Sequence, residues 1–506
     1  MRSFPRSSRR PVPIRPLVLG CALFFAVGLD ACATDQLHPN NDGGPPPNRW
    51  TGTLYPGQRD VDVVFVIDDS SGMAAAQNNL ISNFPTFMTA LQADPAGLPN
   101  LQIAVVSTDF GAGDGSIAGC DYMGGKNGVF QYAARGTCSA SNLQRGATFI
   151  SNVGGGNYTG NIADVFGCIA ALGQSGCGFQ QPLAAVLRAF GADGRDPPQE
   201  NQSFLRPEAV LAIVMLTPQD DCSAAPGNGP NAQVPLFDTS ANHDMASQLG
   251  PPTHFRCNEF GHTCPRGMLG PNRNVPHPDR TAPNNDVNQT VTYDNCASDD
   301  TEGYLLSTKQ AADAIKSLKA DPNRIVVTSI QGPPTPYTVH WNAPAYDDAS
   351  CGAASCPWPA ITHACTAADG RVGDPGVRNA QLAEEFGING LQLSVCDASF
   401  GPGLARFAAA INQTLGPPCV QGPVGLNSSG QPDCKVTEMQ PDGAGHIISS
   451  HVPSCADSAN LAPCWQLETS ATCPDQILQV SPDPNIPSSI PVTVTYDCAK
   501  LTFERG

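Results

Sequence analysis

The chain has 506 residues, is 41% apolar and carries a formal net charge of −18. This length predicts two to four domains, and the apolar fraction indicates a globular protein with a sizeable core. No Lys/Arg-rich run appears beyond the N-terminal segment, so composition and charge argue against a nucleic-acid partner.

The first 32 residues are typical of an export signal. Residues 1–16 carry five arginines and no acid, and residues 17–29 form an apolar run too short to span a bilayer. Leu29, Ala31 and Cys32 resemble a bacterial lipobox, in which the cysteine is lipidated and becomes the first residue of the mature protein. The alternative is a plain secreted protein cut nearby. We expect a lipid-anchored protein of the outer membrane or cell surface, or otherwise a periplasmic or secreted one.

Cysteine usage independently indicates export. There are 20 cysteines; Cys21 lies in the signal segment and Cys32 is the candidate for lipidation. Export makes disulfides the expected state of the others, and their pairing does not follow from the sequence. These candidates are Cys120, Cys138, Cys168, Cys177, Cys222, Cys257, Cys264, Cys296, Cys351, Cys356, Cys365, Cys396, Cys419, Cys434, Cys455, Cys464, Cys473 and Cys498.

Strands and helices are predicted to alternate after a linker at residues 33–57, which is polar and rich in Pro, Gly and Asn. The β-branched run 61–67 is typical of a strand buried on both faces of a parallel sheet. The other predicted strands are 101–109, 209–216, 324–330 and 391–396, and the predicted helices are 73–92, 162–172, 180–191, 307–320, 378–387 and 402–416. This alternation predicts a doubly wound, mostly parallel α/β domain over residues 58–418.

Two Cys- and Pro-rich stretches interrupt the alternation, at about residues 221–305 and 332–376. Loops of this length are uncommon inside a domain unless they are functional or stapled, so we predict disulfide-stapled insertions. Helical periodicity stops near residue 418. Short strand-like pieces and five cysteines beyond residue 430 predict a small Cys-rich β module at 419–506.

The stretch VIDDSSGM, residues 66–73, follows the first predicted strand. A buried strand that ends in Asp-x-Ser, followed by an α/β alternation, resembles a von Willebrand factor type A domain. The stretches 175–190, 214–223, 325–333 and 394–404 resemble a bacterial subgroup of these domains, in exported lipoproteins of the myxobacterial type. The resemblance implies a binding or adhesion module with a metal-ion-dependent adhesion site at the carboxyl ends of the strands.

In that family the metal is usually Mg²⁺ or Mn²⁺, held by oxygen atoms from three loops. Asp68 and Ser70 match the first loop, whereas Gly72 stands at the usual place of a second serine. Ser175 is the nearest hydroxyl for the second loop, and Asp220 is a displaced carboxylate for the third. We therefore expect a degenerate site for Mg²⁺, Mn²⁺ or Ca²⁺ at Asp68, Ser70, Ser175 and Asp220.

The alternative for VIDDSSGM is a vestigial loop that binds no metal. Asp69, Ser70 or Ser71 would then cap the first helix, because oxygen side chains accept its free N–H groups. Pro218 favours this alternative, since it follows Thr217 where the family has an aspartate.

The other motifs do not indicate a further metal site or a catalytic site. Residues 254–264 hold two histidines and two cysteines; a zinc site is conceivable, but we expect a Cys257–Cys264 disulfide in an exported chain. No common hydrolase, metalloprotease or nucleotide-binding motif occurs, so we expect neither an enzyme nor a nucleotide ligand. The expected partner is an extracellular or periplasmic protein or another envelope ligand. The alternatives are a cell-envelope enzyme whose pocket the insertions form, and a metal-free structural scaffold.

Overall fold

The computed structural model describes residues 49–54, 59–94, 96–112, 119–120, 124–224, 235–237, 249, 253–264, 273–274, 290–301, 303–340, 359–416, 419–420, 423–441, 446–458, 461–469, 476–481, 483 and 492–501. In these ranges no helix combines the length and apolar character that a membrane-spanning helix requires. The predicted signal segment and Cys32 lie outside the described residues.

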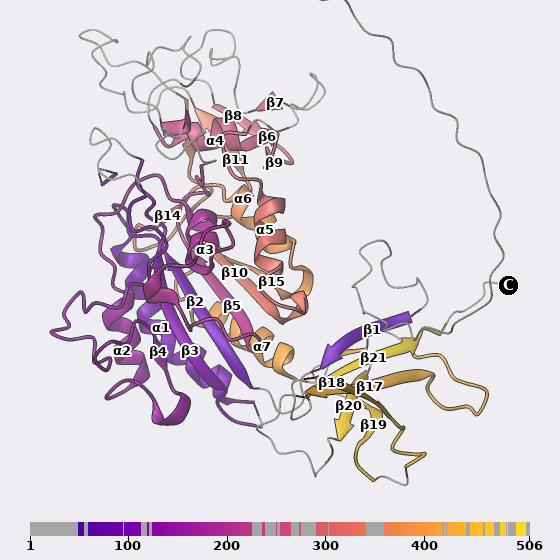
Figure 1. Cartoon of the computed structure of the whole chain (residues 1–506). Helices are drawn as coiled ribbons and strands as arrows, with labels where there is room; N and C mark the ends of the chain where they lie inside the picture. Colours follow the sequence, from indigo (N-terminus) through magenta and orange to yellow (C-terminus); the bar gives the residue numbers. More distant parts are fainter. Residues whose placement is uncertain are drawn as a thin grey trace, which may run out of the picture. The chain divides into compact units, whose positions relative to one another are not determined.

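A mixed α/β fold is built around a six-stranded sheet with the strand order β15-β10-β5-β2-β3-β4 (Figure 1). Five strands run parallel and the short β4 runs antiparallel at one edge. All seven residues of β5 are buried, as expected of a strand covered on both faces. The bounds are β2 Asp60–Ile67, β3 Asn100–Ser107, β4 Ile150–Ser151, β5 Val210–Leu216, β10 Ile325–Gln331 and β15 Gly390–Ser394.

Helices cover both faces of this sheet. Val63 and Phe65 of β2 pack in one apolar cluster, whereas Val64 and Val66 point into a second cluster on the opposite face. The first cluster takes in α1 Ala74–Gln92, α2 Ile162–Ala170 and α7 Gly401–Leu415; the second takes in α3 Pro182–Phe190, α5 Thr308–Lys316 and α6 Val377–Glu384. Short 3₁₀ turns lie at Val153–Gly155, Gln199–Asn201, Pro235–Phe237, Pro322–Arg324 and Gly387–Asn389.

The chain leaves the neighbouring strands β2 and β5 toward opposite faces of the sheet. After β2 it enters α1 on the first face, and after β5 the next helix on the sheet is α5 on the second. The loops therefore separate at the carboxyl ends of these two strands. Ligands of open α/β sheets commonly bind at such a point.

The two predicted insertions meet in one small sheet. β8 Thr290–Tyr293 from the first insertion pairs with β11 Tyr337–His340, which pairs in turn with β12 Ala360–Thr362. The other described elements here are α4 Phe255–Gly261, β6 His262–Cys264, β7 Arg273–Asn274, β9 Ala297–Ser298, β13 Cys365–Thr366 and β14 Val372–Gly373.

Fourteen of the predicted disulfide cysteines are paired in the described part of the chain. The pairs are Cys120–Cys177, Cys138–Cys168, Cys222–Cys257, Cys264–Cys296, Cys365–Cys396, Cys434–Cys498 and Cys455–Cys464. The predicted Cys257–Cys264 bond is wrong, because α4 and β6 direct these two cysteines to partners on different segments. Cys351, Cys356, Cys473 and the side chain of Cys419 lie outside the described residues.

The C-terminal module contains a four-stranded sheet, β1-β21-β17-β18, and a three-stranded sheet, β16-β20-β19. Residues of both sheets, among them Val436, Trp465 and Leu478, share one apolar core. The strands are β1 Arg49–Leu54, β16 Cys419–Val420, β17 Cys434–Pro441, β18 Ile447–Val452, β19 Cys464–Glu468, β20 Gln476–Ser481 and β21 Thr493–Ala499.

One strand of this module comes from the predicted linker. β1 pairs antiparallel with β21 from Arg49 to Leu54, and Leu54 is buried in the module's core. The prediction of a linker over 33–57 is therefore wrong for residues 49–54. The physical reason is that the free edge of β21 supplies the hydrogen bonds and apolar contacts that so short a strand lacks alone.

Candidate functional site

Polar side chains gather at the carboxyl ends of β2, β3 and β5. Asp68, Asp69 and Ser70 follow β2, Ser107 ends β3, and Thr217 follows β5. All five are buried, although they follow some of the most apolar strands of the protein. Because these strands are parallel neighbours, their ends meet at the point where the loops separate.

The Asp68 side chain is fully buried, and its oxygens accept hydrogen bonds from neighbouring groups of the protein. Its carboxylate accepts the backbone N–H of Ser70 at 2.8 Å and the hydroxyl of Thr217 at 3.1 Å. Its carbonyl oxygen accepts the side-chain amide of Gln77 in α1 at 2.9 Å. Burial raises the pKa of Asp68 to about 7, because no full positive charge offsets its desolvation.

The side chain that reaches Ser70 from the second loop is Gln180, not Ser175. The Gln180 amide donates to the Ser70 hydroxyl oxygen at 2.9 Å, and its own amide oxygen is buried without a hydrogen-bond partner in the described structure. Ser175 is exposed. Gln180 is an amide and not a hydroxyl, and its signal in the sequence is the pair of polar residues Gln180 and Gln181 directly before an apolar helix.

Asp220 does not turn toward Asp68, because its oxygens serve another helix. They accept the backbone N–H groups of Arg378 at 2.8 Å and Asn379 at 3.1 Å, in the first turn of α6. The N-cap of α6 is Gly376, which has no side chain to cap these groups. Burial alone would raise the pKa of Asp220, but His262 and these N–H groups hold it below its ordinary value.

Asp221 serves α3 in a similar way. It accepts the N–H of Leu183 at 3.3 Å, and its other oxygen lies 3.1 Å from the Arg378 guanidinium. After Pro218, the consecutive residues Asp220 and Asp221 thus accept hydrogen bonds from the first turns of α6 and α3, respectively. The oxygens of Asp220, the predicted third-loop metal ligand, are therefore bonded to α6.

Asp220 also begins a buried polar chain. The Nε2 atom of His262 lies 2.7 Å from Asp220, and its Nδ1 atom lies 2.7 Å from the hydroxyl of Tyr337. An Asp–His pair with a hydroxyl suggests acid–base chemistry, but all three side chains are buried to 1% exposure or less. These hydrogen bonds between Asp220, His262 and Tyr337 instead join the loop after β5 to the two insertions.

A lysine lies beside the loop on which the sequence predicts a metal, next to Asp69 rather than to the predicted ligands Asp68 and Ser70. The Lys126 ammonium forms an ion pair with Asp69 and lies 3.5 Å from the carboxylate of Asp109. Ser107 donates its hydroxyl to the other Asp69 oxygen at 2.8 Å. Burial raises the pKa of Asp69 although Lys126 counteracts the shift. Sequence reasoning missed Lys126, since it lies far from the motif in a segment without regular structure.

Backbone contacts hold Lys126 in this position. Its N–H donates to the carbonyl of Asp109 at 2.8 Å, and its carbonyl accepts the N–H of Val129 at 3.0 Å. Gly125 has a positive φ of 45°, and a Cβ atom there would lie 2.4 Å from an Asp109 oxygen. The close approach of this loop to Asp109 therefore requires glycine.

The residues present do not fit the predicted metal site. Asp68 and Ser70 lie together, but Ser175 is exposed and the oxygens of Asp220 are bonded elsewhere. Across the described ranges no three His, Cys, Asp or Glu side chains form a group able to hold a metal ion. In the alternative of a vestigial loop, the predicted helix cap is wrong, because the N-cap of α1 is Met73 and no side chain caps it.

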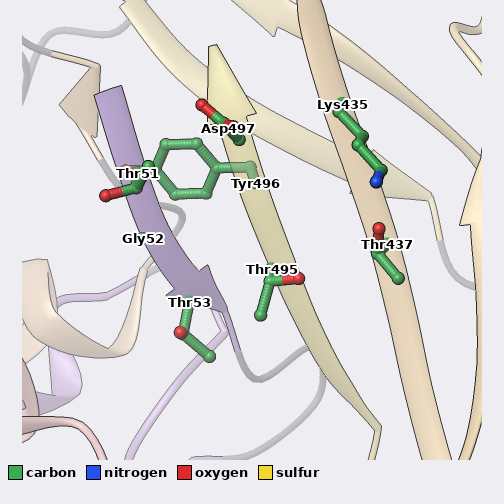
Figure 2. A pocket seen from close by; sticks show the side chains of 8 residues that line it. All are labelled: Thr51, Gly52, Thr53, Lys435, Thr437, Thr495, Tyr496 and Asp497. Carbon is green, nitrogen blue, oxygen red and sulfur yellow. The ribbon is translucent and has the colours of Figure 1, made fainter. Parts of the chain in front are cut away.

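A second polar surface lies on the four-stranded sheet of the C-terminal module (Figure 2). In one cross-strand row Thr51, Asp497 and Lys435 are neighbours, and in the next row Thr53, Thr495 and Thr437 are neighbours. Tyr496 and Gly52 complete the lining of this open groove. Threonine is a common residue on the solvent side of a sheet, so the groove has an ordinary structural explanation.

No family model matches the chain, and no curated protein matches it. Among solved structures it is similar to the pilus adhesin SpaC of Lactobacillus rhamnosus GG, with 13% identity, a TM-score of 0.29 and coverage of 90% of this chain but 41% of SpaC. A von Willebrand factor type A protein from Catenulispora acidiphila has 9% identity and a TM-score of 0.25, covering 91% of this chain and 67% of that one. The pilus tip protein Mfa5 of Porphyromonas gingivalis has 13% identity and a TM-score of 0.28, covering 92% and 66%. The chain thus spans less than half of the length of SpaC.

Proposed function

We propose that this chain is an exported binding or adhesion module of the von Willebrand factor A type. Its binding face is formed by the loops at the carboxyl ends of β2, β3 and β5. The observation that carries the proposal is the polar cluster of Asp68, Asp69, Ser70, Gln180 and Thr217 at the point where the chain leaves β2 and β5 toward opposite faces.

The disulfides support an extracytoplasmic location. Seven bonds are described, and two of them join segments next to the candidate face: Cys120–Cys177 and Cys222–Cys257. Structural disulfides persist in oxidising compartments and are rare in the cytosol. Lipidation at Cys32 belongs to the proposal, which places the protein at the outer membrane or the cell surface.

The proposed partner is an extracellular or periplasmic protein or another envelope ligand, and the proposed role is non-enzymatic. Exposed residues surround the buried cluster: Ser71 on the first loop, and Gln174 and Ser175 on the second. The Gln174 side-chain oxygen accepts the N–H of Gly72 at 3.0 Å, so the two loops support one another. An exposed rim of this kind is accessible to a macromolecular partner.

An adhesion assay under flow tests the proposal. Beads coated with the full mature chain are exposed to washed cells of the organism that produces it, and retained cells are counted. Ser71→Arg and Ser175→Arg place bulky charged side chains on the exposed loops, and we expect each to lower retention about tenfold. Ser429→Arg changes an equally exposed serine of the C-terminal module and should retain cells normally. Equal retention by all variants, or no more than on albumin-coated beads, would refute the proposed face.

A further inference from the structure

The ion pair of Lys126 is the strongest feature near the carboxyl ends of β2 and β3 that the proposed function leaves unused. Asp69 is almost completely buried, and an ionised carboxylate in such a place requires a positive partner. Lys126 provides it from a loop between β3 and β4, at a separation of 57 positions along the chain. Its side chain is 29% exposed, so the ammonium lies between the buried carboxylate and solvent.

We infer that the Lys126 ammonium is a built-in cation, which supplies at this site the positive charge that a bound divalent ion would otherwise supply. Asp69 contacts the ammonium directly and the carboxylate of Asp109 lies 3.5 Å from it, so two carboxylates surround the position of the ammonium. A hard divalent cation needs the same arrangement of oxygen atoms and completes its shell with water. The lysine and a metal ion would therefore exclude one another.

The tether favours the lysine over an ion from solution. A backbone hydrogen bond from Lys126 to Asp109 fixes the segment beside that residue, so the ammonium is held next to its carboxylates at a high effective concentration. A metal ion would have to displace this ammonium from two carboxylates that are both buried, Asp69 and Asp109. The native chain should consequently fold and act without any divalent cation.

Removal of the ammonium should uncover a metal site. In Lys126→Gln the Asp69 and Asp109 carboxylates lose their common counter-ion, and the neutral amide cannot neutralise them. A divalent cation then becomes the available source of positive charge. The inference shares its location with the proposed function, but its readouts are metal affinity and stability, which can succeed or fail whether or not the loops bind a partner.

The test compares the full mature chain and its variants by calorimetric titration with Mg²⁺, Mn²⁺ and Ca²⁺, and by thermal unfolding with chelator or millimolar cation. The native chain should bind none of the three ions and should unfold at one temperature under all conditions. Lys126→Gln should unfold at a lower temperature in chelator and recover with at least one cation. Its affinity for that cation should exceed that of the native chain by about tenfold or more.

Two further variants serve as controls. Lys126→Gln combined with Asp69→Asn removes a carboxylate and should lose the gained affinity. Lys316→Gln removes a lysine of similar exposure, 26%, whose partner Glu385 lies 3.3 Å away at the surface, and should gain no metal binding. If Lys126→Gln does not fold in chelator, recovery in a divalent cation supports the inference. Cation binding by the native chain, or a Lys126→Gln variant that no cation binds or restores, overturns it.

Discussion

Replacing Asp68 by asparagine should make the stability of the protein less dependent on pH. The folded state holds the Asp68 pKa at about 7, against 3.8 for the unperturbed group, because burial disfavours its charged form. A carboxyl whose pKa is raised on folding contributes stability that is fully present below its unfolded pKa. That contribution is lost as the pH rises through the folded value.

The size of the effect follows from the two pKa values. Between pH 5 and pH 8 the folded group releases its proton, whereas the unfolded group is already ionised at both ends of the interval. One pK unit corresponds to about 1.4 kcal/mol, so the native protein should lose about 2.5 kcal/mol of unfolding free energy through Asp68 over this interval. The amide introduced by Asp68→Asn would keep the shape of the carboxyl and accept the Ser70 N–H, and it carries no charge at any pH.

Urea unfolding of the native chain and Asp68→Asn, in chelator at pH 5 and pH 8, measures this difference. The variant should gain about 2.5 kcal/mol relative to the native protein on going from pH 5 to pH 8. Asp62 and Asp221 are not among the groups that shift the Asp68 pKa, so their titration is common to both proteins and cancels in the comparison. A difference between the two proteins that stays constant with pH would show that Asp68 has an ordinary pKa.

Three more substitutions probe the framework of the site and the module. Asp220→Ala leaves two helix N–H groups and a buried histidine without their acceptor, and should lower the unfolding free energy by about 3 kcal/mol in urea. Gly52→Ala places a Cβ atom 2.6 Å from the Tyr496 ring; we expect a loss of about 1–3 kcal/mol, which Tyr496→Leu in the same chain should partly restore. Loss of the Cys138–Cys168 bond, by serine at both positions, should cost about 3 kcal/mol in thermal unfolding; an unchanged transition would contradict a structural role.

The main strands and helices could be predicted because their signals are local. The apolar run at 61–67 is a strand from Asp60 to Ile67, and the helical pattern at 402–416 is a helix from Gly401 to Leu415. Burial on both sheet faces selects continuous β-branched runs, and covering helices need one apolar stripe. Both patterns are complete within a short stretch and so can be read from one chain.

The site could be predicted only where it depends on neighbouring residues. Asp68 and Ser70 bond to each other two positions apart, and their motif is visible in the sequence. The hydrogen bonds of Asp220 depend on Arg378, which lies 158 positions later in the first turn of α6. The N-cap residue of that helix is a glycine, which has no side chain to cap it. The role of Lys126 depends on a carboxylate 57 positions away. No periodicity or motif records such distant pairings.

The pairing of β1 with β21 has a consequence for how the protein is made. Arg49 and Asp497 are hydrogen-bonded across 448 positions, so β1, the first strand of the described residues, meets its neighbour only when β21, the last one, has been made. Until then Leu54 and the free edge of β1 remain open to other chains. The sheet of the C-terminal module therefore needs both ends of the described chain to be complete. A chain that lost β1 or β21 would still carry the strands of the six-stranded sheet, yet it would expose an unpaired sheet edge that can pair with other chains.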